Sequence, residues 1–162
     1  MRIRHELRYD APPDEVYAMV CDPSFREEVC AAMGVLRQEV SVDPTPEGVR
    51  VRIDMTQRTQ GIPAFARKVV GDRTRVVQTE TWRSPAAADL EVRIPGRPGH
   101  IRGTISLASD GGRGTVECFD GAATIRVPLV AGRLEGLVET LFVAGMDTEQ
   151  EVGARWLAGD RA

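Results

Sequence analysis

Hydrophobic and polar residues alternate along much of the chain, which is the pattern of half-buried β-strands. In residues 2–9, for example, Ile3, His5, Leu7 and Tyr9 fall on one face and charged residues on the other. Turn signals such as PGRPG and DGGRG separate the later strands. Strands at this spacing predict an antiparallel sheet. The predicted strands are 2–9, 35–43, 49–58, 73–83, 88–94, 100–108 and 115–127, with a bulge expected around Asp120-Gly121.

Helical spacing replaces the alternation in three places. Two short helices are predicted between Pro12 and Gly34, separated by Asp22-Pro23, with Asp14 or a neighbour as the first cap and Gly34 as the final stop. Residues 61–71 predict a short helical or irregular connection. The order of elements indicates an α+β fold.

Residues 129–157 predict one long helix, which at 1.5 Å per residue would extend roughly 40 Å. Its apolar stripe needs a large partner, and the concave face of the sheet is the candidate. Glycines within this helix each cost roughly 1 kcal/mol relative to alanine, so they indicate a close backbone approach or space beneath the helix. The stripe comprises Leu134, Leu137, Val138, Leu141, Gly145, Thr148, Val152 and Trp156, and the glycines are Gly132, Gly136 and Gly145.

Three segments, together with the order of elements, resemble the START-like (SRPBCC) superfamily. They are YDAPPDEVYAMVCDPSF at 9–25, QTETWR at 78–83 and VPLVAGRLEGLVETL at 127–141. More narrowly, the chain is similar to an actinobacterial family within that superfamily that has no agreed activity. The resemblance implies a helix-grip fold, in which about seven strands wrap around the C-terminal helix and leave a cavity. It carries over no catalytic residues, because the superfamily includes binders, carriers, cyclases and dehydratases.

Composition and charge narrow the classes of partner. The 162 residues fit a single domain over 1–162. The net charge is −3 and the basic residues are dispersed, which argues against a nucleic-acid partner. No segment has the length of apolar sequence that a membrane span needs, and MRIRHELRYD lacks the apolar core of a secretory signal, so we expect a cytoplasmic protein. A monomer or a weak homodimer fits equally well.

Metal, cofactor and nucleophile chemistry find little support in the sequence. The two histidines, His5 and His100, fall on different predicted strands and no ligand spacing surrounds them. Cys21, Cys30 and Cys118 are too scattered for a disulfide framework, and buried inert thiols are expected. We therefore expect no metal and no cofactor.

Glu80 is the one candidate for acid or base chemistry. It shares a face of strand 73–83 with Gln78 and Trp82, but both faces of this strand are mixed, so the inward face is undecided. If the Trp82 face points inward, Glu80 enters an apolar pocket, where burial would raise the carboxyl pKa. The simpler interpretation is that Glu80 faces solvent or pairs with an arginine across the sheet, such as Arg50, Arg52 or Arg102.

An apolar lining with few polar groups favours a small hydrophobic ligand, such as a lipid, an isoprenoid or a polyketide-like molecule. The alternatives are a cyclase-like or dehydratase-like enzyme acting in the same cavity and a protein-interaction module. The enzyme would need two or more titratable groups that converge in the cavity, with Glu80 or Tyr9 as acid or base. The predicted ligand-binding residues are Tyr9, Ile53, Met55, Gln78, Glu80, Trp82, Ile105, Cys118, Leu137 and Leu141, and the inward set also includes Ile3, Val51 and Val92.

Overall fold

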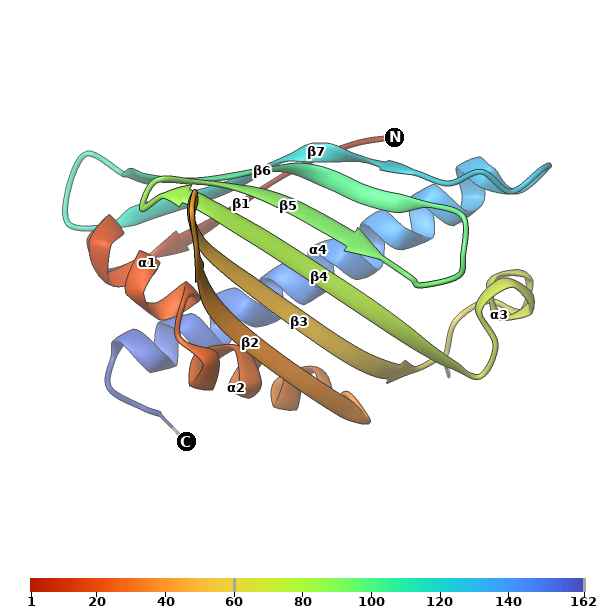
Figure 1. The fold of residues 1–162 in the computed structure, drawn as a ribbon, viewed down its shortest axis with the longest axis horizontal. Coiled ribbons are helices and arrows are strands. Elements are labelled where there is room, and N and C mark those ends of the chain that lie inside the picture. Colours follow the sequence, from red (N-terminus) through yellow and green to blue (C-terminus); the bar gives the residue numbers. More distant parts are fainter. Residues whose placement is uncertain (60, 162) are drawn as a thin grey trace.

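The structure, a computed structural model, describes residues 1–59 and 61–161. Seven strands and four helices follow the predicted order (Figure 1). The strands are β1 (Arg2–Tyr9), β2 (Arg37–Thr45), β3 (Gly48–Arg58), β4 (Arg73–Ser84), β5 (Ala87–Arg93), β6 (His100–Ser109) and β7 (Thr115–Thr124). The helices are α1 (Pro13–Val20), α2 (Pro23–Met33), α3 (Ala64–Val70) and α4 (Ala131–Leu157).

All seven strands form one antiparallel sheet in the order β1-β7-β6-β5-β4-β3-β2. The first and last strands of the chain therefore pair, which places β1 beside the strand that leads into α4. In Figure 1, α4 crosses the sheet diagonally, α1 and α2 cover one end, and α3 lies at the other. The α+β helix-grip architecture expected from the sequence is confirmed.

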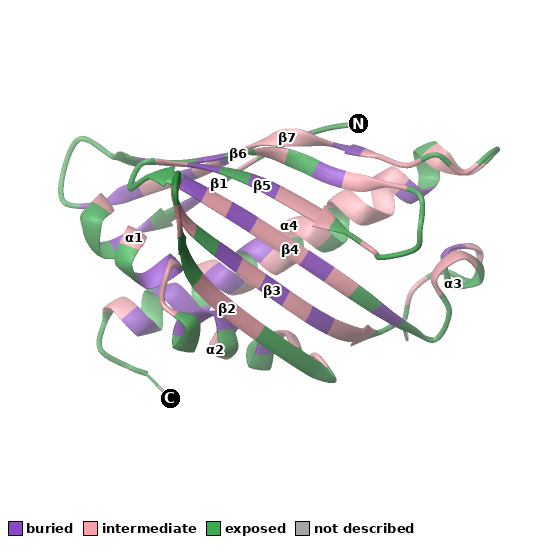
Figure 2. Cartoon of the chain, viewed as in Figure 1, coloured by how far each residue is buried: buried purple, intermediate pink, exposed green. Residues whose placement is uncertain are grey.

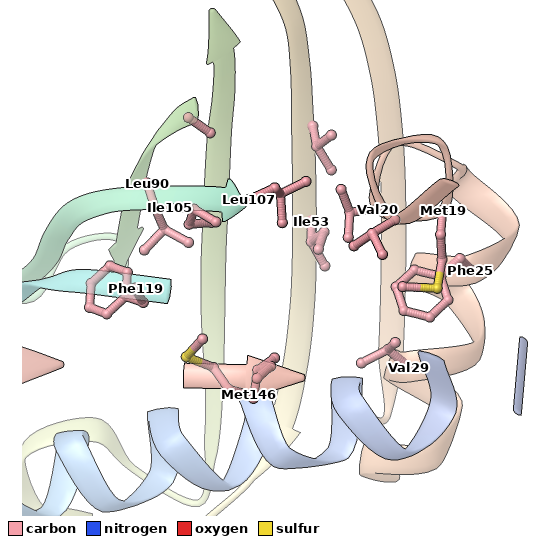
Figure 3. Packing of buried hydrophobic residues seen from close by; sticks show 14 of the residues in the cluster. Met19, Val20, Phe25, Val29, Ile53, Leu90, Ile105, Leu107, Phe119 and Met146 are labelled. Atoms are coloured by element: carbon pink, nitrogen blue, oxygen red, sulfur yellow. The ribbon is translucent and has the colours of Figure 1, made fainter. Parts of the chain in front are cut away.

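Side-chain burial follows the alternation that predicts the strands. Buried residues alternate with more exposed ones along β3 in Figure 2. Between the sheet and the helices, apolar side chains from both layers pack together, as Figure 3 shows for Phe25 and Val29 on α2, Phe119 on β7 and Met146 on α4. Burial of this apolar surface is the main force that holds the helices against the sheet.

The expected bulge at Asp120-Gly121 is wrong. Strand β7 pairs in regular register with β1 and β6 through both residues, and the irregularity lies instead between Trp82 and Ser84 of β4. Gly103 and Gly121 face each other across β6 and β7, where a Cβ on Gly103 would come within 2.6 Å of the Gly121 Cα. The glycine that disturbs the alternation thus permits a close approach of two strands.

Local signals set the ends of α2 as expected. The Asp22 carboxylate accepts a hydrogen bond from the Ser24 backbone N–H at 2.9 Å, which caps the first turn. Gly34 ends the helix with a left-handed φ of 71°. Helix α1 instead begins after Pro12 without a side-chain cap, and Asp14 lies within its first turn.

The glycines of α4 serve different purposes along the helix. Gly132, Gly136 and Gly145 have no backbone of another element close to them, so they do not mark a close approach. Gly145 instead lines the space beneath the helix. The tight contact is at Gly153, where an added Cβ would lie 2.6 Å from the Tyr9 Cε1 atom.

Candidate functional site

A cavity of about 240 Å³ lies between the sheet and α4. Helix α4 has its closest contacts with α2, β1 and β7, which leaves space between it and the strands in the middle of the sheet. Apolar side chains from both layers line most of the cavity. They include Ile53, Met55, Leu90, Val92, Ile105, Phe119, Leu137, Val138 and Phe142.

The inward face of β4 brings a carboxylate into this apolar space. Trp82 and Glu80 are each 1% exposed, so their face points inward and the undecided parity of this strand is resolved. Arg26 of α2 donates a hydrogen bond from Nη2 to the Glu80 Oε2 atom at 2.7 Å. The partner of Glu80 is therefore a helical arginine, and none of the cross-strand arginines considered from the sequence.

Glu80 is held by neighbours on its own strand as well. Trp82 Nε1 donates to Glu80 Oε2 at 2.9 Å, and Gln78 Nε2 donates to Glu80 Oε1 at 2.8 Å. Residues two apart on a strand share a face, which is why these three side chains meet. Both carboxylate oxygens of Glu80 thus have partners.

Arg26 connects two layers of the molecule. Its Nε atom donates to the Val20 carbonyl at 2.7 Å, and its Nη1 atom lies 3.4 Å from Glu149 Oε2 on α4. Burial lowers the pKa of Arg26, but the carboxylates of Glu80 and Glu149 outweigh that effect and leave the pKa raised. The guanidinium therefore stays charged inside the protein.

Two further carboxyl groups complete the acidic end of the cavity, which we define as Arg26, Glu80, Glu117 and Glu149. Glu117 on β7 and Glu149 on α4 both line the cavity. Among the described residues, Glu117 Oε2, Glu149 Oε1 and the nearby Tyr9 hydroxyl are buried without a hydrogen-bond partner. Unsatisfied buried polar atoms are rare in folded proteins, so three of them here call for an explanation.

Burial dominates the electrostatics of these carboxyl groups. It raises the pKa of Glu117 well above its usual range, and repulsion from Glu149 and Glu80 raises it further. The pKa of Glu149 is also raised by burial, although Arg26 opposes the shift. Burial likewise raises the pKa of Tyr9, with Glu117 adding to the effect. These shifts favour the protonated forms of Glu117, Glu149 and Tyr9.

Most of the predicted ligand-binding residues lie at this cavity. Leu141 is 47% exposed even though it lines the cavity. The residues brought together there are Ile53, Met55, Gln78, Glu80, Ile105, Leu137 and Leu141, along with Val92 from the inward set. Whether they bind a ligand stays a prediction.

Three predicted ligand-binding residues do not line the cavity. Tyr9 and Trp82 point inward but are enclosed by the core, where Trp82 packs edge-on against Tyr17 with ring centroids 5.5 Å apart. Cys118 lies on the outer face of β7, because it falls between the inward-facing Glu117 and Phe119. The alternation of side chains on a strand thus directs Cys118 away from the cavity.

Sequence reasoning missed Arg26, Glu117 and Glu149. A signal existed for each, because each occupies an inward position of its own periodic pattern. Arg26 precedes Val29 and Cys30 by three and four positions, and Glu149 lies four after Gly145 and three before Val152 on the α4 stripe. Glu117 is two residues before the inward Phe119. A charged residue at an inward position was the available clue.

Within the residues that the structure describes, no group of three or more His, Cys, Asp or Glu side chains is arranged to hold a metal ion. In that same part of the chain, no helix is long and apolar enough to cross a membrane.

Comparison with known sequences finds one family model over nearly the whole chain. The model described as "Protein of unknown function (DUF2505)" matches residues 4–157. No curated protein sequence is similar enough to count as a match.

Solved structures show where else this fold occurs. A Thermus thermophilus protein is 21% identical, with a TM-score of 0.64 over 98% of this chain and 99% of that one. Truncated norcoclaurine synthase from Thalictrum flavum is 16% identical, with a TM-score of 0.63 over 94% and 92%. The Zhui aromatase/cyclase from Streptomyces sp. R1128 is 16% identical, with a TM-score of 0.59 over 97% and 95%. These likenesses confirm the START-like fold, and at such identities they establish the fold alone.

Proposed function

The chain belongs to the DUF2505 family, and we propose that it binds a small hydrophobic molecule in the cavity between the sheet and α4. The observation that carries this proposal is a cavity of about 240 Å³ with mostly apolar walls inside a packed core. Ligand sites are commonly concave and apolar with a few polar groups that fix orientation. The acidic end would supply those polar groups.

The names of the similar structures support a small organic ligand. One is a synthase and another an aromatase/cyclase, and both share the fold of this chain. Their activities do not carry over to this chain, since the fold hosts different chemistries. What they support is the use of this architecture around organic molecules.

One observation favours an enzyme as a second candidate. Glu80, Glu117, Glu149 and Arg26 converge at the cavity, which is the convergence of titratable groups that a cyclase-like or dehydratase-like reaction would need. Glu117 would act as the proton donor, because burial raises its pKa and so favours the protonated carboxyl group. Glu80 fits this role less well, since Arg26, Trp82 and Gln78 occupy both of its oxygens.

Native mass spectrometry of the freshly purified protein tests the binding proposal. We expect an excess mass that is released on denaturing extraction as a defined hydrophobic molecule. Titration with Nile red, a neutral hydrophobic dye, follows if the ligand is lost during purification. The absence of both a co-purified molecule and saturable dye binding would reject the proposal.

The extracted molecule then separates the two candidates. Incubation with the protein should leave it unchanged if the protein is a binder, whereas an enzyme should convert it. The Glu117→Gln variant keeps the shape of the side chain but cannot donate a carboxyl proton. Turnover that persists unchanged in Glu117→Gln would exclude Glu117 as the proton donor.

A further inference from the structure

The acidic end of the cavity contains more carboxyl groups than cations. Glu80, Glu117 and Glu149 come from β4, β7 and α4, and they meet a single guanidinium, that of Arg26, among the described residues. All four side chains line the same cavity. Ionised together, the three carboxylates would outnumber the arginine, so the cluster needs either protons on Glu117 and Glu149, whose pKa burial raises, or a further cation. Burying net charge in this way is costly unless it is compensated.

Arg26 cannot satisfy the remaining acceptors by itself. Its hydrogen bonds go to the Val20 carbonyl, to Glu80 at 2.7 Å and to Glu149 at 3.4 Å, and the last is the weakest of the three by distance. Glu80 is already satisfied on both oxygens. The free acceptors are therefore Glu117 Oε2 and Glu149 Oε1, which have no partner in the described part of the chain.

Glu117 is 3% exposed and Glu149 is 9% exposed, and both side chains line the cavity. A buried acceptor without a donor costs about 1–3 kcal/mol, and more when it is charged. A ligand that supplies donors at this position would recover that cost. A ligand with an ionised carboxylate or phosphate head group would instead place negative charge beside three acidic side chains.

We propose that the acidic end receives the head group of the hydrophobic ligand and that this head group is a protonated amine. An ammonium offers three donors and no acceptor, so it can serve Glu117 and Glu149 together. Its positive charge would favour loss of the protons from Glu117 and Glu149, whose carboxylates would then accept charge-assisted hydrogen bonds, which are stronger than neutral ones. A hydroxyl group could donate one hydrogen bond but carries no positive charge to compensate a carboxylate.

Basic side chains line the opposite part of the cavity. Its lining includes Arg58, at the end of β3, and Arg97 and His100, in and after the turn between β5 and β6. That turn and α3 lie at the end of the sheet away from α1 and α2 in Figure 1. The two ends would thus orient an amphipathic ligand with its amine towards α2.

The inference rests on the proposed function, and one set of probes tests both. Octylamine, 1-octanol and octanoate have the same chain length and differ in head group. Isothermal titration calorimetry at neutral pH and physiological salt gives the affinity of each. We expect octylamine to bind at least about tenfold more tightly than octanoate, with octanol between them.

Variants assign the preference to the acidic end. The double variant Glu117→Gln/Glu149→Gln preserves side-chain shape and removes both carboxyl groups, and it should lose the preference for the amine. Burial already favours the neutral forms of both groups, so the variant is expected to fold, which circular dichroism checks. Glu151→Gln is the matched control, because Glu151 is an exposed residue two positions further along α4. It should retain the preference.

The outcomes are distinguishable. Octanoate binding as tightly as octylamine, or an amine preference that survives in the double variant, would overturn the head-group inference while leaving a hydrophobic ligand in place. If none of the three probes binds and Nile red does not bind either, the proposed function is overturned, and the head-group inference falls with it.

Discussion

Arg26 joins three parts of the chain that are distant in sequence. It contacts the Val20 carbonyl at the end of α1, Glu80 on β4 and Glu149 on α4. Because the arginine side chain is only 2% exposed, these partners replace water almost completely. A buried ion pair contributes little compared with an apolar pair, but removing one partner leaves an uncompensated charge.

Replacing Arg26 with methionine is therefore expected to destabilise the protein by about 3–5 kcal/mol. The loss should be smaller at pH 5 than at pH 8, since the carboxyl groups left behind can take up protons at the lower pH. Urea unfolding at pH 5 and at pH 8, monitored by circular dichroism, measures the loss of stability at each pH. Arg155→Met is the control, because Arg155 is exposed on α4, and it should change stability by less than about 0.5 kcal/mol. Equal effects of the two substitutions would contradict a structural role for Arg26.

The raised pKa of Glu117 predicts how the free energy of unfolding depends on pH. Burial raises its pKa in the folded state, so the folded protein keeps a proton that the unfolded chain releases above about pH 4.3. The stability contributed by this proton is present at low pH and is lost as the pH rises towards the folded pKa. Glu117→Gln has no titratable group at this position, so it removes this contribution to the pH dependence of stability.

The stability of Glu117→Gln relative to the unmodified protein should therefore increase with pH. Above about pH 4.3, this difference in the free energy of unfolding should rise by at most about 1.4 kcal/mol per pH unit. It should level off once the pH exceeds the pKa of Glu117 in the folded protein. Urea unfolding at several pH values between 4 and 8 measures the difference. Glu151→Gln should give a difference that is nearly constant with pH. A constant difference for Glu117→Gln as well would show that its folded pKa is not raised.

Single residues were the hardest part of the site to predict from the sequence. The alternation on 73–83 was clear, but both faces of the strand carry polar and apolar residues, so the orientation of Glu80 depended on contacts with α2. Arg26, Glu117 and Glu149 occupy inward positions, yet charged residues are seldom fully buried. These residues can be buried because they form a cluster with one another. They are far apart in the sequence, so the cluster becomes visible only in the folded structure.

At the scale of elements, the sequence predicted much more. Alternation and helical spacing identified the seven strands and the long helix to within a few residues, because each element buries one face. The short connection at 61–71 contains α3, one of its two expected forms. The bulge at Asp120-Gly121 was wrong because glycine has two uses in a strand, and here it permits the close approach of β6 and β7.

The glycines of α4 give a prediction at this scale. Gly136 has the Met1 side chain as its nearest neighbour, 3.8 Å from an added Cβ, so Gly136→Ala should fit without strain. It should stabilise the protein by up to about 1 kcal/mol through helix propensity. Gly153→Ala should destabilise it despite the same gain, because its Cβ would meet Tyr9 at 2.6 Å and Met19 at 3.1 Å. Thermal unfolding of the two variants measures this contrast.

Each variant serves as the control for the other, since both exchange glycine for alanine within one helix. Stabilisation by both substitutions would mean that α4 does not press against Tyr9 as closely as the structure places it. Destabilisation by both would show that α4 is also tightly packed at Gly136, near its N-terminal end.

At the scale of the whole molecule, the cavity follows from the path of α4. The helix contacts α2 and the β1–β7 edge most closely, and the central strands therefore face it across open space. The sequence predicted a helix lying on a concave sheet, but not how far the two layers stand apart. That distance depends on the strand order, in which the first strand closes beside the last, and on the curvature of the sheet.

A matched pair of Val→Trp substitutions tests whether this space is a true void. Val92 on β5 lines the cavity, whereas Val51 on β3 is fully buried and does not line it. An indole placed at Val92 can extend into the cavity, so Val92→Trp should cost less than about 1 kcal/mol of stability. At Val51 the same side chain would overpack the core, which typically costs about 1–3 kcal/mol. Urea unfolding of both variants gives the comparison.

Ligand binding supplies the second half of this test. Val92→Trp fills the volume that the hydrophobic molecule would occupy, so it should weaken Nile red binding and reduce any co-purified ligand by about tenfold or more. Val51→Trp, where it remains folded, should leave binding nearly unchanged. If Val92→Trp were as destabilising as Val51→Trp, the space beneath α4 would be closed in solution. If Val92→Trp instead folded normally and bound the dye unchanged, the hydrophobic site would lie elsewhere on the protein.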